Sequence, residues 1–376
     1  MQAPSFPSTD SSGEESIGRR PVQSNLIRAT LALCALCCAV SCTNLPVYST
    51  EIGNVTAHAD DPESAADLAR RGWQAREAVT KLLPGSTRED LVLVERRPDQ
   101  MPGPFAHGYT ETPSFGALRS GSGRRIFLRD TAAPAVLTHE LVHASLGAQW
   151  RALPPVLEEG LADHLAFVIH PDSYLQVERW QAALWREFDV QVEHVLAIGE
   201  SREAGSFTLR LSPGPTPAPF DAATALELSA SQAFSPETAA LGNRFYGLGF
   251  AMVERLVERI GLDGLHHFTF NASQVRTYLL PGDVIDLLGG GEDLLPRAWL
   301  ERRLELALQA SLLDFPELRD LVADRYARAL ALDADLEPAE FATSLSLRFS
   351  VDDRAWTSWR DLPGYESLIQ RLERRN

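Results

Sequence analysis

Cysteine is almost absent from this chain. Its 376 residues include four cysteines, all between positions 34 and 42, and none follows them. The chain beyond residue 42 therefore has no disulfide bond, and its stability must come from a buried core. A hydrophobic content of 44% over this length is sufficient for one large domain or two smaller ones.

Basic stretches are missing as well. The formal net charge is −16 at pH 7, and no stripe of Lys and Arg stands out in the sequence. Nucleic-acid binding depends on clustered cations that displace counterions from phosphates. We therefore expect no nucleic-acid partner.

Long apolar runs are also rare. The one at the N-terminus, "ATLALCALCCAVSC", follows Arg28 and is shorter than the ~20 residues that a membrane-spanning helix needs. It has the length of a signal-peptide core. The small residues Val40 and Ser41 precede Cys42, and this end of the run resembles a bacterial lipobox. The resemblance implies that Cys42 is lipidated and anchors an exported protein to a membrane of the cell envelope; a plain secretory signal is the alternative.

The order of the expected elements indicates an α+β fold. Apolar residues at three-and-four spacing predict a helix at 62–83, and short β-prone runs at 91–97, 106–112 and 124–130 predict a small mixed sheet. Helical patterns dominate afterwards, between residues 170 and 236 as well. The expected divisions are a leader at 1–42, a tether at 43–61, a helix-and-sheet subdomain at 62–133, a helical catalytic subdomain at 134–340, and a strand and helix at 341–376.

The stretch "LTHELVHASLG" places three polar side chains in an apolar helix expected at 134–146. His139 and His143 are four residues apart and share one helix face, so both can bind one ion. Glu140 lies about 100° around the helix from His139, where it can reach a water molecule on that ion instead of the ion itself. This pattern is typical of a zinc site that activates water.

A third ligand is expected in "LPPVLEEGLADHLA", on a helix at 155–168. Glu159 and Asp163 are four residues apart, and two carboxylates at this spacing repel each other unless a cation or a donor separates them. Metal binding by Glu159 and a hydrogen bond from a ligand histidine to Asp163 would remove the conflict. Glu158 is the competing third ligand, but it points away from the face that carries Asp163.

The segments "HELVH" and "LEEGLAD" together resemble the gluzincin metallopeptidases, which include thermolysin-like and aminopeptidase-N-like enzymes. The resemblance implies a zincin-like fold, with a small sheet, an active-site helix and a helical subdomain. It implies that His139, His143 and Glu159 bind Zn²⁺, that Glu140 is the general base, and that Asp163 orients His139. It also implies that the strand at 124–130 is an edge strand that holds an extended peptide.

The segment "FYGLGFAMVERLVERIG" resembles the aminopeptidase-N-like helix whose tyrosine stabilises the oxyanion. In this chain the tyrosine is Tyr246; a packing role in an amphipathic helix is the alternative. The sequence thus predicts an exported zinc metallopeptidase that hydrolyses peptides or proteins. Two other hypotheses stay open: a catalytically silent envelope lipoprotein with this fold, and a non-haem iron oxygenase, which also uses two histidines and one carboxylate.

Overall fold

The computed structural model describes residues 46–101, 107–111, 124–184, 188–197, 204–213, 221–228, 242–276, 278–290, 294–311, 316–331, 336–338, 346–351, 354–356 and 365–373. The leader with its lipobox and Cys42 lies outside these ranges. Within them, no helix has the length and the apolar content needed to cross a membrane.

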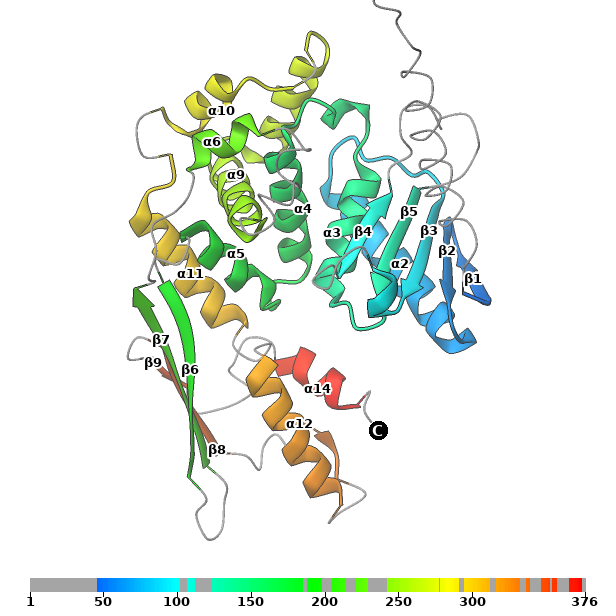
Figure 1. The fold of residues 1–376 in the computed structure, drawn as a ribbon, viewed down its shortest axis with the longest axis vertical. Helices are drawn as coiled ribbons and strands as arrows, with labels where there is room; N and C mark the ends of the chain where they lie inside the picture. Colours follow the sequence, from blue (N-terminus) through cyan, green and yellow to red (C-terminus); the bar gives the residue numbers. More distant parts are fainter. Residues whose placement is uncertain are drawn as a thin grey trace, which may run out of the picture. The chain divides into compact units, whose positions relative to one another are not determined.

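The first part of the chain forms a five-stranded mixed sheet (Figure 1). The strands lie in the order β1-β2-β3-β5-β4, with β2, β3 and β5 parallel and the two outer strands antiparallel to their neighbours. The three strands predicted from the sequence are confirmed as β3 (Leu91–Arg96), β4 (Gly108–Glu111) and β5 (Arg124–Arg129). The α+β class is therefore confirmed.

The segment expected to be a tether is part of this sheet instead. β1 (Tyr48–Ile52) and β2 (Val55–Ala59) form an antiparallel hairpin around Gly53, which has a φ of 60°. The side chains of β2 alternate between buried and half-buried, as expected for a strand with one face on the core. The prediction of a tether at 43–61 was therefore wrong for residues 48–59.

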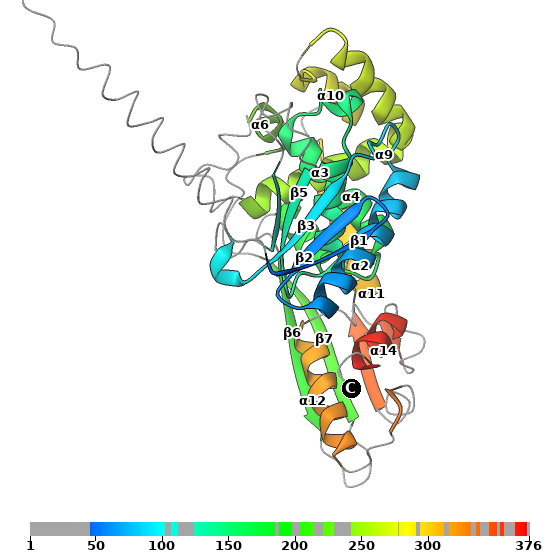
Figure 2. The same cartoon turned by 90° about the vertical axis from the view of Figure 1, so that its right-hand side faces the viewer.

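Two helices cover one face of the sheet (Figure 2). α2 (Pro62–Leu82), as predicted, packs over β1 and β2, and α3 (Pro134–Ser145) packs beside it over β4 and β5. Asp61 caps α2, because its carboxylate accepts hydrogen bonds from the backbone N–H groups of Glu63 and Ser64 at 3.0 and 2.9 Å. Apolar side chains of both helices join the sheet in one core.

The helical part continues from α3 through a short turn, η2 (Ala148–Trp150), into α4 (Pro155–Ile169). α5 (Leu175–Leu184) follows, and the long α9 (Gly242–Ser273) packs against both α4 and α5. Smaller helices complete this part of the fold: α6 (Ala222–Glu227), α10 (Pro281–Leu288) and α11 (Arg297–Ser311). The helices predicted at 134–146 and 155–168 are confirmed as α3 and α4, and α9 changes direction at Gly261, whose φ is 73°.

A second sheet corrects two further expectations. β6 (Phe188–Ala197) and β7 (Ala204–Pro213) form a long hairpin where helices were expected. β7 also pairs in parallel with β8 (Ser346–Val351), which in turn pairs with β9 (Arg354–Trp356). The division at residue 341 is therefore wrong, because the C-terminal strands complete a sheet that begins at residue 188. Two helices accompany the C-terminal segment, α12 (Pro316–Leu330) and α14 (Tyr365–Glu373).

Candidate metal centre

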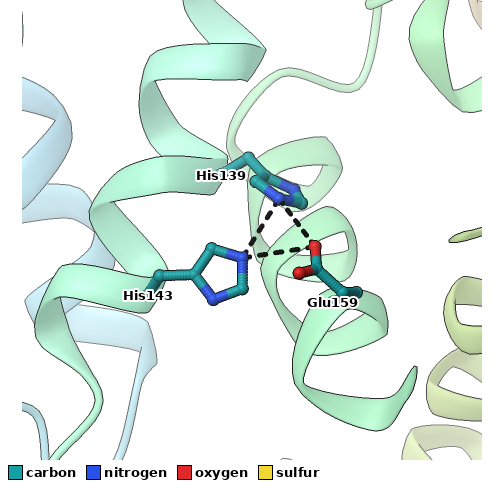
Figure 3. A group of neighbouring side chains, drawn as sticks. All are labelled: His139, His143 and Glu159. Carbon is teal, nitrogen blue, oxygen red and sulfur yellow. Dashed lines mark hydrogen bonds and ion pairs between the residues drawn. The ribbon is translucent and has the colours of Figure 1, made fainter. Parts of the chain in front are cut away.

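Three side-chain atoms converge between α3 and α4 (Figure 3). The Nε2 atoms of His139 and His143 lie 3.2 Å apart. Oε2 of Glu159 lies 3.2 Å from the first nitrogen and 3.3 Å from the second. This His-His-Glu group is the one set of potential metal ligands among the described residues, and it can hold a metal ion.

The spacing of the three atoms fits one ion of zinc-like size. A tetrahedral ion with ligand bonds of about 2.0–2.1 Å separates its ligand atoms by about 3.3–3.4 Å. The three observed separations, 3.2, 3.2 and 3.3 Å, are close to that value. Two neutral imidazoles and a carboxylate are also the donor types that zinc accepts in catalytic sites.

The geometry of α3 follows from its ends. Pro134 occupies the first turn, and the four-residue spacing places His139 above His143 on the side of α3 that faces α4. At the C-terminus, Arg124 of β5 donates hydrogen bonds to the carbonyl groups of Ala144 and Leu146, at 2.6 and 3.1 Å. The sheet thereby fixes the end of the helix that carries both histidines.

Carboxylates hold the outer nitrogen of each histidine. His139 Nδ1 lies 2.8 Å from Asp163 Oδ1, so the two residues are in the arrangement that the sequence predicted. His143 Nδ1 lies 3.0 Å from Glu158 Oε1. Glu158, the competing third ligand, therefore contacts the far side of His143 instead of the point where the three atoms meet. Both carboxylates orient the imidazoles so that each Nε2 faces Glu159.

Arg179 of α5 is a member of the site that sequence reasoning missed. Its Nε lies 2.5 Å from Asp163 Oδ2, and its guanidinium lies 4.9 Å from the centre of the Tyr246 ring. Asp163 thus receives one donor from His139 and another from Arg179. No periodicity or motif links α5 to α4 in the sequence, so only the fold could show this contact.

The charges of the metal-free site depend on these contacts. Burial lowers the pKa of His139, but the charge of Asp163 and the hydrogen bonds to Asp163 and Glu159 together outweigh burial and raise that pKa to about 9. Burial raises the pKa of Glu159, but the charges of His143 and His139 and the hydrogen bonds to both histidines together outweigh burial and bring that pKa below its usual range. In the metal-free protein, protons therefore occupy imidazoles that a metal ion would need in their neutral form.

Glu140 lies on α3 beside β4 and is 8% exposed. The hydroxyl of Thr110 lies 2.6 Å from Glu140 Oε2 and 3.2 Å from the backbone carbonyl oxygen of the same residue. A methyl group at Gly108 would lie 3.0 Å from Glu140 Cγ, which is tighter than an ordinary contact. Two residues of β4 therefore confine the carboxylate.

Tyr246 is placed on α9 near the same group of charges. Burial is the largest cause that raises the pKa of its hydroxyl above the ordinary value of 10, and the negative charge of Glu159 adds to it. Arg179 opposes this shift without reversing it. The phenol therefore keeps its proton at physiological pH and can donate a hydrogen bond.

Other histidines of the helical part have local partners. His164 Nδ1 lies 2.5 Å from a carboxylate oxygen of Glu254, and His170 Nε2 lies 2.8 Å from the Thr138 hydroxyl. His266 Nε2 lies 2.6 Å from Gln149 Oε1. These contacts join helices and loops to one another, as expected of structural histidines.

Comparison with protein-family models, with curated proteins and with solved structures gives no significant match. The function must therefore be argued from the geometry of the site and from the motifs that it contains.

Proposed function

We propose that the protein is a zinc-dependent metallopeptidase of the gluzincin type with a zincin-like fold. The observation that carries the proposal is the convergence of His139 Nε2, His143 Nε2 and Glu159 Oε2, whose mutual distances of 3.2, 3.2 and 3.3 Å fit the ligands of one ion. Glu140, which follows the ligand His139 on α3, supplies the carboxylate that a general base requires. The motifs "HELVH" and "LEEGLAD" support the same assignment.

Each residue then has a distinct part in peptide hydrolysis. A bound Zn²⁺ would supply a water molecule of lowered pKa and polarise the substrate carbonyl group. Glu140 takes the proton from the attacking water and later gives it to the leaving amine. Tyr246, which keeps its proton, donates a hydrogen bond to the carbonyl oxygen as negative charge develops there.

The substrate strand is proposed to lie along β4. β5, which was expected at the edge, is an interior strand between β3 and β4, and β4 is the end strand of the sheet among the described strands. Arg129 N donates to His107 O at 3.0 Å, so these opposite residues form a hydrogen-bonded pair. Because such pairs alternate, the backbone N–H and C=O groups of Gly108 and Thr110 point away from β5. They can pair with an extended peptide.

The test combines metal analysis with a digest. Protein purified without added metal should contain one zinc per chain, and it should cleave an unstructured protein. Glu140→Gln should retain the zinc and lose at least about 100-fold in kcat, because general acid–base catalysis contributes about 10²–10⁴-fold. The matched control is Glu63→Gln, which changes an exposed glutamate on α2 and should leave kcat unchanged.

The outcomes separate the alternatives. Zinc without cleavage by the parent protein would favour the catalytically silent lipoprotein. Iron in place of zinc would favour an oxygenase. Cleavage by Glu140→Gln at the parental rate would refute the proposed mechanism.

We further propose that Cys42 is lipidated and anchors the enzyme to an envelope membrane. The support is the apolar run that ends in Val40, Ser41 and Cys42. Cys42→Ser should leave the protein in the aqueous fraction when membranes are sedimented. Membrane association of that variant equal to the parent's would refute the anchor.

A further inference from the structure

We infer that Thr110 is the positioning residue of Glu140, and that it couples the docking of a peptide strand on β4 to the placement of the base. This inference rests on the proposed function for its catalytic meaning. The hydrogen bond between Thr110 and Glu140 is present in the structure whatever reaction the protein catalyses.

The side chain of Thr110 is hydrogen-bonded to that of Glu140. The Thr110 hydroxyl has one proton, and the closer acceptor is Glu140 Oε2 at 2.6 Å, a length typical of a hydroxyl that donates to a carboxylate. A carboxylate whose one oxygen is held in this way keeps its other oxygen in a fixed direction. Thr110 therefore selects one orientation of the Glu140 side chain.

β4 approaches α3 closely at Gly108. Gly108 is two residues before Thr110 and faces the same side of the sheet. A Cβ at Gly108 would stand 3.0 Å from Glu140 Cγ and 3.1 Å from Val136 Cγ1. A side chain at residue 108 would therefore press on Glu140 and Val136, and glycine leaves the strand room to lie where the Thr110 hydroxyl reaches the carboxylate.

Side chains and backbone groups alternate in direction along β4. Tyr109 points to the opposite face, where its ring stacks on Phe127 with ring centres 4.7 Å apart. The backbone groups of Gly108 and Thr110 point away from β5, to the side of β4 on which none of the described strands lies. A peptide that pairs with Thr110 through its backbone would thus fix the residue whose side chain holds the base. Thr110 would therefore take part both in substrate binding and in the placement of the base.

Two substitutions of Thr110 test this role, one that removes the hydroxyl donor and one that keeps it. Thr110→Val keeps the shape and the β-branch but removes the donor, whereas Thr110→Ser keeps the donor. The matched control is Thr87→Val, because the Thr87 hydroxyl contacts the far end of α3, 3.5 Å from the Ser145 carbonyl oxygen. We expect kcat of Thr110→Val to fall at least about tenfold, with zinc content unchanged, because only the base is displaced. Thr110→Ser and Thr87→Val should keep kcat within about twofold of the parent.

A second measurement is independent of activity. The free energies of urea unfolding of the metal-free parent, Thr110→Val, Glu140→Ala and the double variant form a double-mutant cycle. The cycle should be non-additive, because either single change removes the same hydrogen bond. The cycle with Thr87→Val in place of Thr110→Val should be additive.

The two measurements distinguish the possible failures. Parental kcat in Thr110→Val, or an additive cycle, would overturn the role of Thr110 even if the protein cleaves peptides. A non-additive cycle in a protein that cleaves nothing would instead overturn the proposed peptidase function and, with it, the catalytic meaning of the contact.

Discussion

Gly160 of α4 lies against Gly249 of α9 so closely that a methyl group on Gly160 would collide with the Gly249 carbonyl group. A methyl group on Gly249 would in turn collide with the Val156 carbonyl oxygen. The absence of both side chains lets the two helices cross at backbone contact. This crossing brings Tyr246, one turn before Gly249, toward the helix that carries Glu159.

The first prediction concerns this crossing. Gly249→Ala should lower the free energy of unfolding by about 1–3 kcal/mol, because the added methyl group must force the two helices apart. Chemical unfolding in urea measures the change. Gly282→Ala is the control, since nothing lies within 4 Å of a Cβ at Gly282, and it should not destabilise the protein. Equal stability of the parent and Gly249→Ala would contradict the close packing.

The second prediction concerns the hydroxyl of Tyr246. Tyr246→Phe should lower kcat by about 10²–10³-fold, the loss seen when a single oxyanion donor is removed, while the zinc content stays the same. Kinetics on a peptide substrate would show it. Tyr278→Phe, at a tyrosine that is 51% exposed, should change nothing. A full rate in Tyr246→Phe would leave this tyrosine with a packing role.

The third prediction concerns Asp163. Asp163→Asn keeps the size of the side chain but loses the charge that orients His139 and pairs with Arg179. Zinc affinity should fall about 10–100-fold, as measured by competition with a chelator. Asp67→Asn, on the surface of α2, is the control and should bind zinc like the parent. Unaltered affinity in Asp163→Asn would show that His139 needs no such partner.

The fourth prediction concerns pH in the metal-free protein. The pKa of His139 is raised to about 9 in the fold, above its ordinary value of 6.5. Protonation of this group therefore adds stability that is complete below pH 6.5 and lost as the pH rises through 9. The pKa values of Glu159 and Asp163 are lowered, so their contribution is present above their ordinary values and lost in acid. Urea unfolding across pH should show a maximum between about pH 4.5 and 6.5 for this group of residues.

Metal binding should displace the proton that His139 carries in the metal-free protein. At pH 7, His139 must give up its proton before Nε2 can bind a metal ion, so binding should release at least one proton per chain. Titration calorimetry in two buffers of different ionisation enthalpy measures the number released. A binding enthalpy that is independent of the buffer would contradict the raised pKa of His139.

Local patterns were enough to predict the centre of the site. The four-residue spacing places His139 and His143 on one face of a helix wherever that helix lies, and the conflict between Glu159 and Asp163 pointed to a cation and a donor near them. The structure brings all four together. Their ligand roles and the zinc itself stay predictions.

Contacts between distant segments were not predictable in this way. Arg179 meets Asp163 because α4 and α5 both pack against α9, and Thr110 meets Glu140 because β4 packs against α3. Both residues are single polar side chains without a motif around them. The contact of Glu158 was not predicted because it involves Nδ1 of His143, the nitrogen that faces away from the expected ion.

Two hairpins were missed although the sequence carries their signals. The turn Gly53-Asn54 separates two short β-prone runs, which is typical of a hairpin. In the segment 188–197, "FDVQVEHVLA", apolar and polar residues alternate over its first part, a period that fits a strand better than a helix. The register of β7 with β8 has no local signal, because their residues are far apart in the chain.

That long-range pairing has a consequence for biosynthesis. During synthesis, the β6–β7 hairpin leaves the ribosome well before residues 346–351. Until β8 is made, the edge of β7 that β8 will pair with is exposed and can pair with other strands or other chains. Truncated chains that end near residue 341 lack β8, so this edge of β7 would stay unpaired. We expect them to precipitate, so the useful expression boundary lies after the final helix.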